Sequence, residues 1–396
     1  MNQKKQSMVM IITFFIVILL LLSGCIDNRA PVPDETDLSS FSRSDLLFIQ
    51  QQLMDWFECH LNKNTGLLTD MRENTSLIQD LLTGFVLATF SSMNTTFPGV
   101  LQQNINSIVR IYDDHPDGFN LTTTSLLLSL IYETPESTSN PVLEQALADH
   151  ILSFRATNTQ FNTTPILSDE AAYGLTALRT HVQKTNNQSI QKNTTLLLEY
   201  YQQLLNEPSY YSPWYTPVFS QIDSSFNLPV NPYQTITQIN TVLVENQETN
   251  DLLTTGNYIP PDQSYDLTFH IQSLNSMMYA VNRSDNLNDT KNQTHFHQSL
   301  ILGLMHLKNI MLNEKTNLSI KQNLTLLPIL YELNSVLPNT NYSYVWEPET
   351  QTLIEAKTLQ TSNELWMVLA IGVMASIGLL SLVFIIIRLY YRNKKS

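Results

Sequence analysis

Three carboxylates at the expected starts of two helices are the weak candidates for acid chemistry: Asp169, Glu170 and Asp266. Glycoside hydrolysis needs two carboxyl groups beside one bond, one as acid and the other as base or nucleophile. Acidic residues are also favoured at helix amino ends for another reason, because they cap backbone N–H groups and complement the helix dipole. We therefore interpret these three residues as helix caps and predict no catalytic residue.

Aromatic side chains crowd a proline-rich segment between residues 210 and 233, where they show no helical spacing. The segment predicts a long loop, and long loops in compact domains are commonly functional. Aromatic faces stack on sugar rings or apolar chains. The alternative is a loop that packs its rings onto the body of the domain. The candidate ligand-binding residues are Tyr211, Trp214, Tyr215 and Phe219.

Other polar motifs favour structure over chemistry. The acidic turn at residues 113–118 lacks the spacing of a calcium loop, and its Pro-Asp-Gly sequence is typical of a tight turn. His295 and His297 are two residues apart, so on a helix they point in different directions. We predict no metal site and no cofactor.

The first 25 residues predict an export signal. Lys4 and Lys5 precede an apolar run that ends in the small residues Ser23, Gly24 and Cys25. The end of this run resembles a prokaryotic lipobox, which implies a lipid on Cys25. An ordinary signal peptide and an uncleaved anchor are the alternatives. If Cys25 carries no lipid, a disulfide with Cys59 stays open.

An uncharged apolar segment at residues 365–387 has the length of a bilayer-spanning helix and is predicted to be one. A basic tail follows at residues 388–396, and positive tails face the cytoplasm. We therefore expect a protein of the cell membrane with a cytoplasmic carboxyl terminus and an extracellular domain. The membrane is its first predicted partner.

The exported part is strongly acidic. It holds 15 of the 21 basic residues and all 35 acidic residues. Such a charge argues against nucleic-acid binding, which needs a basic surface. Twelve Asn-x-Ser/Thr sequons predict glycosylation at Asn74, Asn94, Asn120, Asn162, Asn187, Asn193, Asn282, Asn288, Asn292, Asn317, Asn323 and Asn341.

Apolar residues recur at helical spacing between residues 43 and 337, which predicts an all-α extracellular domain. A tether at residues 26–42 precedes this domain, and a stalk at residues 338–364 follows it. Two short runs near residues 342–346 and 352–354 are expected to pair as a hairpin. Helices are expected at about 43–61, 77–92, 98–113, 121–133, 140–156, 168–184, 188–206, 233–246, 265–282, 294–313 and 321–336.

Several of these helices follow a short turn that contains Gly or Phe, as at Gly66, Gly118-Phe119 and Phe161. About six such units occur, at irregular spacing. The pattern resembles the α/α toroid of the terpenoid cyclase and protein prenyltransferase superfamily, which implies a ring of helical hairpins. An irregular bundle or another array of helical hairpins is the competing interpretation. The acidic run of triterpene cyclases and the thioester motif of complement-like toroids are absent from the sequence.

These observations predict an anchored, glycosylated surface domain that binds a carbohydrate or a surface protein without catalysis. The alternative is a toroid enzyme that acts on glycans or lipid-linked saccharides. An enzyme requires two carboxylates that converge on one site, whereas a binding domain requires only an accessible aromatic or polar surface.

Overall fold

The computed structural model describes residues 40–68, 76–92, 98–134, 140–207, 210–249, 256–260, 266–312, 318–337, 342–347, 350 and 352–355. These ranges contain twelve α-helices and three short 3-10 helices. The α-helices are α2 (Arg43–His60), α3 (Leu77–Ser92), α4 (Pro98–Asp114), α5 (Leu121–Glu133), α6 (Pro141–Ser153), α7 (Asp169–Thr185), α8 (Gln188–Leu205), α9 (Thr216–Ser220), α10 (Pro232–Glu245), α11 (Leu267–Asn286), α12 (Thr290–Leu312) and α13 (Ile320–Glu332). The 3-10 helices are η1 (Pro116–Gly118), η3 (Pro213–Tyr215) and η4 (Leu333–Ser335).

Side-chain caps explain where many of these helices begin. Asn120 accepts a hydrogen bond from the backbone N–H of Thr123 at the start of α5, and the Thr123 side chain reaches back to the Asn120 N–H. Such reciprocal caps satisfy backbone donors that have no partner within the helix. The expected helix ranges agree with the structure to within a few residues, except that α9 was not expected.

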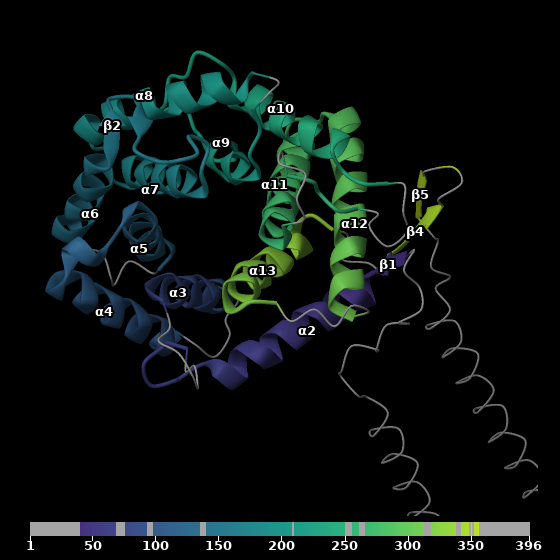
Figure 1. The fold of residues 1–396 in the computed structure, drawn as a ribbon, viewed down its shortest axis with the longest axis horizontal. Coiled ribbons are helices and arrows are strands. Elements are labelled where there is room, and N and C mark those ends of the chain that lie inside the picture. Colours follow the sequence, from purple (N-terminus) through teal and green to yellow (C-terminus); the bar gives the residue numbers. More distant parts are fainter. Residues whose placement is uncertain are drawn as a thin grey trace, which may run out of the picture.

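The helices alternate between inner and outer positions around the molecule (Figure 1). The odd-numbered helices from α3 to α13 lie inside, and the even-numbered helices from α2 to α12 lie outside. Each inner helix packs against the next, and α13 packs against α3, so the inner contacts form a closed circuit. The buried hydrophobic core is continuous between the two sets of helices.

Two small antiparallel sheets accompany the helices. β4 (Ser343–Glu347) pairs with β5 (Thr352–Glu355) and also with β1 (Ser40–Ser42), beside α12 (Figure 1). β2 (Arg155–Thr157) pairs with β3 (Gln160–Phe161). The predicted hairpin is therefore confirmed, but β1 joins it from the other end of the chain. Tyr344 and Trp346 of β4, in the segment expected to form a stalk, are buried.

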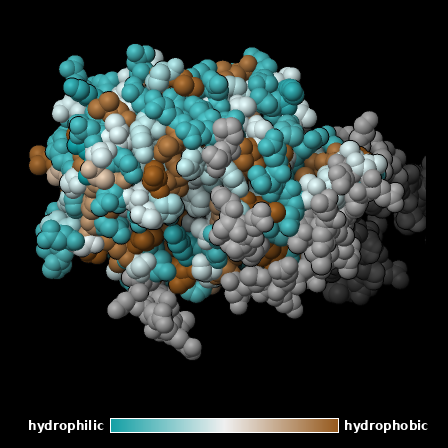
Figure 2. Space-filling model, turned by 45° about the horizontal axis from the view of Figure 1, so that its top comes forward, coloured by the Kyte–Doolittle hydropathy of each residue, from teal (hydrophilic) through white to brown (hydrophobic). Residues whose placement is uncertain are grey.

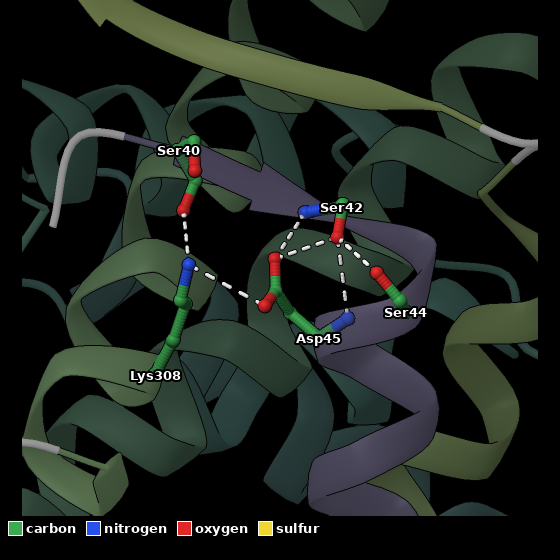
Figure 3. Close-up of polar contacts among 5 residues, drawn as sticks. All are labelled: Ser40, Ser42, Ser44, Asp45 and Lys308. Atoms are coloured by element: carbon green, nitrogen blue, oxygen red, sulfur yellow. Dashed lines mark hydrogen bonds and ion pairs between the residues drawn. The ribbon is translucent and has the colours of Figure 1, made fainter. Parts of the chain in front are cut away.

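A buried ion pair holds the first described residues against α12 (Figure 3). Lys308 Nζ lies 3.4 Å from Asp45 Oδ1 and donates a 3.0 Å hydrogen bond to the Ser40 carbonyl oxygen. The Lys308 and Asp45 side chains are 3% and 5% exposed. The other carboxylate oxygen of Asp45 accepts hydrogen bonds from the Ser42 N–H and hydroxyl groups, both at 2.7 Å. Each charge is thus compensated where water does not reach it.

The predicted fold class is wrong. The described residues are mostly helical, with two small sheets beside the helices, so the helical character is not what fails. Within those ranges no helix combines the length and the apolar character that a bilayer span requires. The longest, α12, carries Lys291, Lys308 and three histidines, which suits packing inside a protein. The predicted span at residues 365–387 lies outside the described residues.

The toroid fold is also not shown. A closed circuit of helices describes an arrangement, and helix packing alone does not assign a chain to a superfamily.

Hydrophobic residues on the face seen in Figure 2 lie in small scattered groups among hydrophilic ones. The apolar residues that set the helical period are instead in the core between inner and outer helices.

Replacing Lys308 by Met tests the buried ion pair. The free energy of unfolding should fall by about 3–5 kcal/mol, because Asp45 would keep a buried charge without its cation. A second change, Asp45→Asn, should restore part of the loss, since Asn retains a capping oxygen. Urea unfolding of the full chain measures both variants. Lys192→Met on the exposed surface of α8 is the control and should change the free energy of unfolding little. An equally small change for Lys308→Met would contradict the stabilising role of the ion pair.

Candidate functional site

Two of the three predicted carboxylates accept hydrogen bonds from the backbone of the helices that they begin. Asp169 Oδ1 accepts a 3.0 Å hydrogen bond from the Glu170 N–H in the first turn of α7. Asp266 precedes α11 and accepts a 2.8 Å hydrogen bond from the Thr268 N–H. Glu170 also lies in that first turn of α7. These positions fit capping and interaction with the helix dipole.

The aromatic segment is not one long loop, because η3 and α9 occupy its middle. Two of the four predicted ligand-binding residues, Tyr215 and Phe219, are 0% and 1% exposed. The Tyr215 ring stacks on Tyr201 at 5.6 Å, and its hydroxyl donates to the Ser168 carbonyl oxygen at 3.3 Å. Both side chains belong to the core, where a ligand has no access.

The other two predicted residues, Tyr211 and Trp214, are partly exposed and are called the aromatic pair. Both rings pack edge-on against Phe269 in the first turn of α11, with centroid distances of 6.4 Å and 5.9 Å. The Tyr211 hydroxyl donates a 3.2 Å hydrogen bond to the Ile259 carbonyl oxygen. These contacts fix two rings that keep part of their surface open to solvent.

The aromatic pair lies near the amino ends of two inner helices. η3 packs against both α7 and α11. The charge of Asp169 contributes to the raised pKa values of Tyr173 and Tyr215, after the larger effect of burial. A carboxylate and fixed aromatic rings therefore share one end of the molecule.

The expected turn at residues 113–118 is present, with η1 at its centre and a hydrogen bond from the Phe119 N–H to the Pro116 carbonyl oxygen. Throughout the ranges that the structure describes, no group of three or more His, Cys, Asp or Glu side chains could hold a metal ion. Cys59 is exposed. Cys25 lies outside the described residues.

The predicted glycosylation sites fall into distinct settings. Asn74, Asn94, Asn317 and Asn341 lie outside the described residues. Asn193, Asn282, Asn292 and Asn323 lie within helices rather than between them, and Asn323 is 7% exposed. The side-chain amide nitrogens of Asn187 and Asn292 donate to Gln145 and Asp289. The exposed sequons are at Asn120, Asn162, Asn282 and Asn288.

A second set of polar side chains converges toward the carboxyl ends of the inner helices. Arg179 of α7 is 2% exposed, and its Nη1 donates to the carbonyl oxygens of Pro217 and Val218 at 3.0 and 2.7 Å. Its Nη2 donates to Gln221 Oε1 at 2.6 Å. Gln221 Nε2 donates to the Tyr279 hydroxyl of α11 at 3.5 Å. Arg179 thus secures the short helix α9 and connects it to α11.

Two glutamates complete this set. Glu133 and Glu332 are the last residues of α5 and α13, and both are exposed. Surrounding protein raises the pKa of Glu332, and the charge of Glu133 raises it further. We call Glu133, Arg179, Gln221, Tyr279 and Glu332 the polar cluster.

Burial and neighbouring charges both shift the pKa values of Arg179 and Tyr279. Burial is the main cause that lowers the pKa of Arg179 to about 10, and Tyr279, Asp223 and Glu133 oppose this effect. Burial also raises the pKa of Tyr279, with further contributions from Glu332 and Glu133. The charges of the two glutamates therefore act on the ionisation of Tyr279, and that of Glu133 also acts on Arg179.

Sequence reasoning missed the polar cluster because its members are about 40 to 60 residues apart and form no motif. The sequence feature that could have indicated this cluster was the repeat of helical units. Each member lies in or just after a different inner helix, at a corresponding part of successive units.

Comparison with protein-family models, with curated proteins and with solved structures finds no match to this chain. The resemblance to the cyclase and prenyltransferase superfamily therefore stays a prediction from the helix pattern. What the chain binds must be inferred from its own side chains.

Arg179→Lys tests the support of α9. A lysine has one donor group and cannot reproduce the planar contacts with two carbonyl oxygens and Gln221. The free energy of unfolding should fall by about 1–3 kcal/mol, measured by urea unfolding, because buried acceptors lose their partners. Arg110→Lys on the exposed face of α4 is the matched control. Equal stability of the two variants would contradict the structural role of Arg179.

Proposed function

We propose that this chain is a domain of the cell surface that binds a carbohydrate without catalysis. The observation that carries the proposal is the aromatic pair. Tyr211 and Trp214 rest on Phe269 with part of each ring open to solvent. Rings fixed in this way can stack on the apolar face of a sugar with little loss of conformational freedom.

Nearby polar groups support a carbohydrate over a purely apolar ligand. Asp169 is partly exposed at the amino end of α7, which η3 contacts. Carbohydrate sites combine an aromatic face with acceptors and donors for hydroxyl groups. A lipid chain would instead favour a larger continuous apolar surface.

The arrangement of the predicted acids favours binding over hydrolysis at this end. Asp169 and Asp266 each accept hydrogen bonds from the backbone N–H groups of their own helices. A hydrolytic pair must instead face one bond from two sides. Carboxylates committed to helix ends are suited to accepting a hydroxyl hydrogen bond.

The proposed location follows from the sequence. The predicted export signal and the acidic composition suit a protein on the outer face of the cell membrane. Sequons at exposed positions such as Asn162 and Asn288 are compatible with the same location.

Trp214→Ala and Tyr211→Ala test the proposed function. On an array of immobilised oligosaccharides, the full chain should bind a subset of glycans. Each variant should bind that subset at least about fivefold more weakly, since aromatic stacking contributes about 1 kcal/mol beyond area burial. Tyr200→Ala on the outer helix α8 is the control and should bind normally.

Two results would contradict the proposal. Wild-type protein that binds no glycan, or variants that bind as well as wild type, would exclude the aromatic pair as the site. Release of reducing sugar ends from a bound glycan would show hydrolysis and overturn the claim of binding without catalysis.

A further inference from the structure

A buried histidine holds segment 256–260 against the inner helix α11 and the outer helix α12. His270 of α11 is 0% exposed. Its Nδ1 accepts a 3.3 Å hydrogen bond from the Tyr258 N–H, and its Nε2 lies 3.1 Å from the Gly303 carbonyl oxygen of α12. Because a carbonyl oxygen can only accept, Nε2 carries the proton and Nδ1 is the acceptor. Both ring nitrogens of the neutral side chain are therefore engaged, each by a backbone group.

A second proton on His270 does not fit this arrangement. The imidazolium ion carries hydrogens on both nitrogens, so Nδ1 would face the Tyr258 N–H with a donor of its own. The ring of His306 from α12 lies close by, with ring centroids 5.0 Å apart, and two histidines at this distance oppose each other's protonation. Protonation therefore costs the Tyr258 hydrogen bond and places an uncompensated charge in the core.

The described residues offer His270 no compensating negative charge. The titratable rings that face it are those of His306 and Tyr258, the latter with a centroid distance of 5.4 Å. α9, α10, α13 and η3 also pack against α11. The acidic and basic residues of these elements are exposed: Glu245, Lys321 and Glu332. On α12, Lys308 is engaged with Asp45.

Segment 256–260 lies directly on the backbone of α12. Gly256 has a φ of +91°, and a Cβ added there would clash with the Leu302 carbonyl oxygen. The Tyr258 hydroxyl donates a 2.9 Å hydrogen bond to the Ser299 carbonyl oxygen. Because the packing is this close, a repulsive contact at the Tyr258 N–H can be relieved only when the segment moves away from the helices.

The same segment supports the aromatic pair. The Ile259 carbonyl oxygen, one residue after Tyr258, accepts the hydrogen bond from the Tyr211 hydroxyl. Phe269, next to the buried histidine on α11, carries the edge contacts of both rings of the aromatic pair. A displacement of the backbone at Tyr258 therefore reaches Tyr211 through a single intervening residue.

We propose that His270 is an acid-sensitive latch: its protonation releases segment 256–260 from α11 and α12, loosens Tyr211 and weakens binding at the aromatic pair. The effect on binding rests on the proposed function, whereas the release of the segment does not. A surface domain with such a latch holds its glycan at neutral pH and lets it go in acid.

The direction of the pH effect follows from the closed arrangement. Burial lowers the pKa of His270 well below its ordinary value of 6.5, the charge of His306 lowers it further, and the hydrogen bond to Gly303 opposes this effect. A histidine whose pKa is lowered stabilises the closed form above its ordinary pKa, and this contribution is lost as pH falls below that value. Each pH unit below about 6.5 favours the released form by up to about tenfold.

Amide hydrogen exchange of the full chain without ligand tests the latch. After correction for the pH dependence of the chemical exchange rate, the protection of segment 256–260 should fall at least about tenfold between pH 7.5 and pH 5.0. His270→Gln keeps an acceptor for the Tyr258 N–H and a donor for Gly303 but does not titrate. Its protection should therefore change less than about twofold over the same range.

Two controls separate the latch from general acid sensitivity. His295→Gln, on the exposed surface of α12, should behave as wild type. Protection of α4, which packs against α3 and α5, should not change with pH in any of these proteins. A segment whose protection in the wild-type protein does not change with pH would overturn the proposal, as would an equal fall in α4 or in His270→Gln.

Glycan affinity at the two pH values tests the consequence for binding. A glycan that the wild-type protein binds at pH 7.5 should bind at least about threefold more weakly at pH 5.0, because only the closed form is competent. His270→Gln should bind it equally at both pH values. Tyr211→Phe keeps the ring but cannot donate to Ile259, so it should bind more weakly at pH 7.5 and lose most of the pH dependence.

The outcomes distinguish this inference from the proposed function. Equal wild-type affinity at both pH values, together with a segment that loosens in acid, would overturn the regulation of binding. Absence of any bound glycan would contradict the proposed function alone, because hydrogen exchange measures the latch without a ligand.

Discussion

The arrangement depends on the contact between the first described residues and the last helices. Lys308 of α12 reaches across to Asp45 and Ser40, and β1 pairs with β4 at the same place. Because both charges are buried, this contact is satisfied in one geometry and costly in others. It brings α2 against α12 and α13, while α13 packs on α3. Segments nearly 270 residues apart are thereby held together beside the closed circuit of inner helices.

Alternation of inner and outer helices then separates two kinds of chemistry. Near the amino end of α7, the carbonyl oxygen of the capping residue Ser168 accepts a hydrogen bond from Tyr215 of η3. Asp266 caps α11, whose Phe269 packs against Trp214 of η3. Toward the carboxyl ends of the inner helices, Arg179 donates a hydrogen bond to Gln221, and Gln221 donates one to Tyr279 of α11. The first set is consistent with local helix preferences, because acidic residues are favoured at the amino ends of helices. The second set connects α7, the end of α9 and α11 through side chains that are far apart in the sequence.

Burial decides which aromatic residues can act on a ligand. Tyr215 and Phe219 complete the packing of α9, and Tyr215 stacks on Tyr201. Tyr211 and Trp214 use an edge contact with Phe269 and keep part of their surface accessible. All four lie within one short stretch of sequence, so composition predicted aromatic content without distinguishing core from surface.

The sequence by itself determined the helices, their caps and the small hairpin. Helical periodicity and capping residues are local, and a residue such as Ser168 or Asn120 acts on the next turn of its own helix. The short helix α9 escaped prediction because its place depends on Arg179, 38 residues before Pro217. The sequence also could not show that β1 joins β4, or that Glu133 and Glu332 share one electrostatic environment. Only the tertiary structure decided these features, because they depend on distances between residues that no local pattern connects.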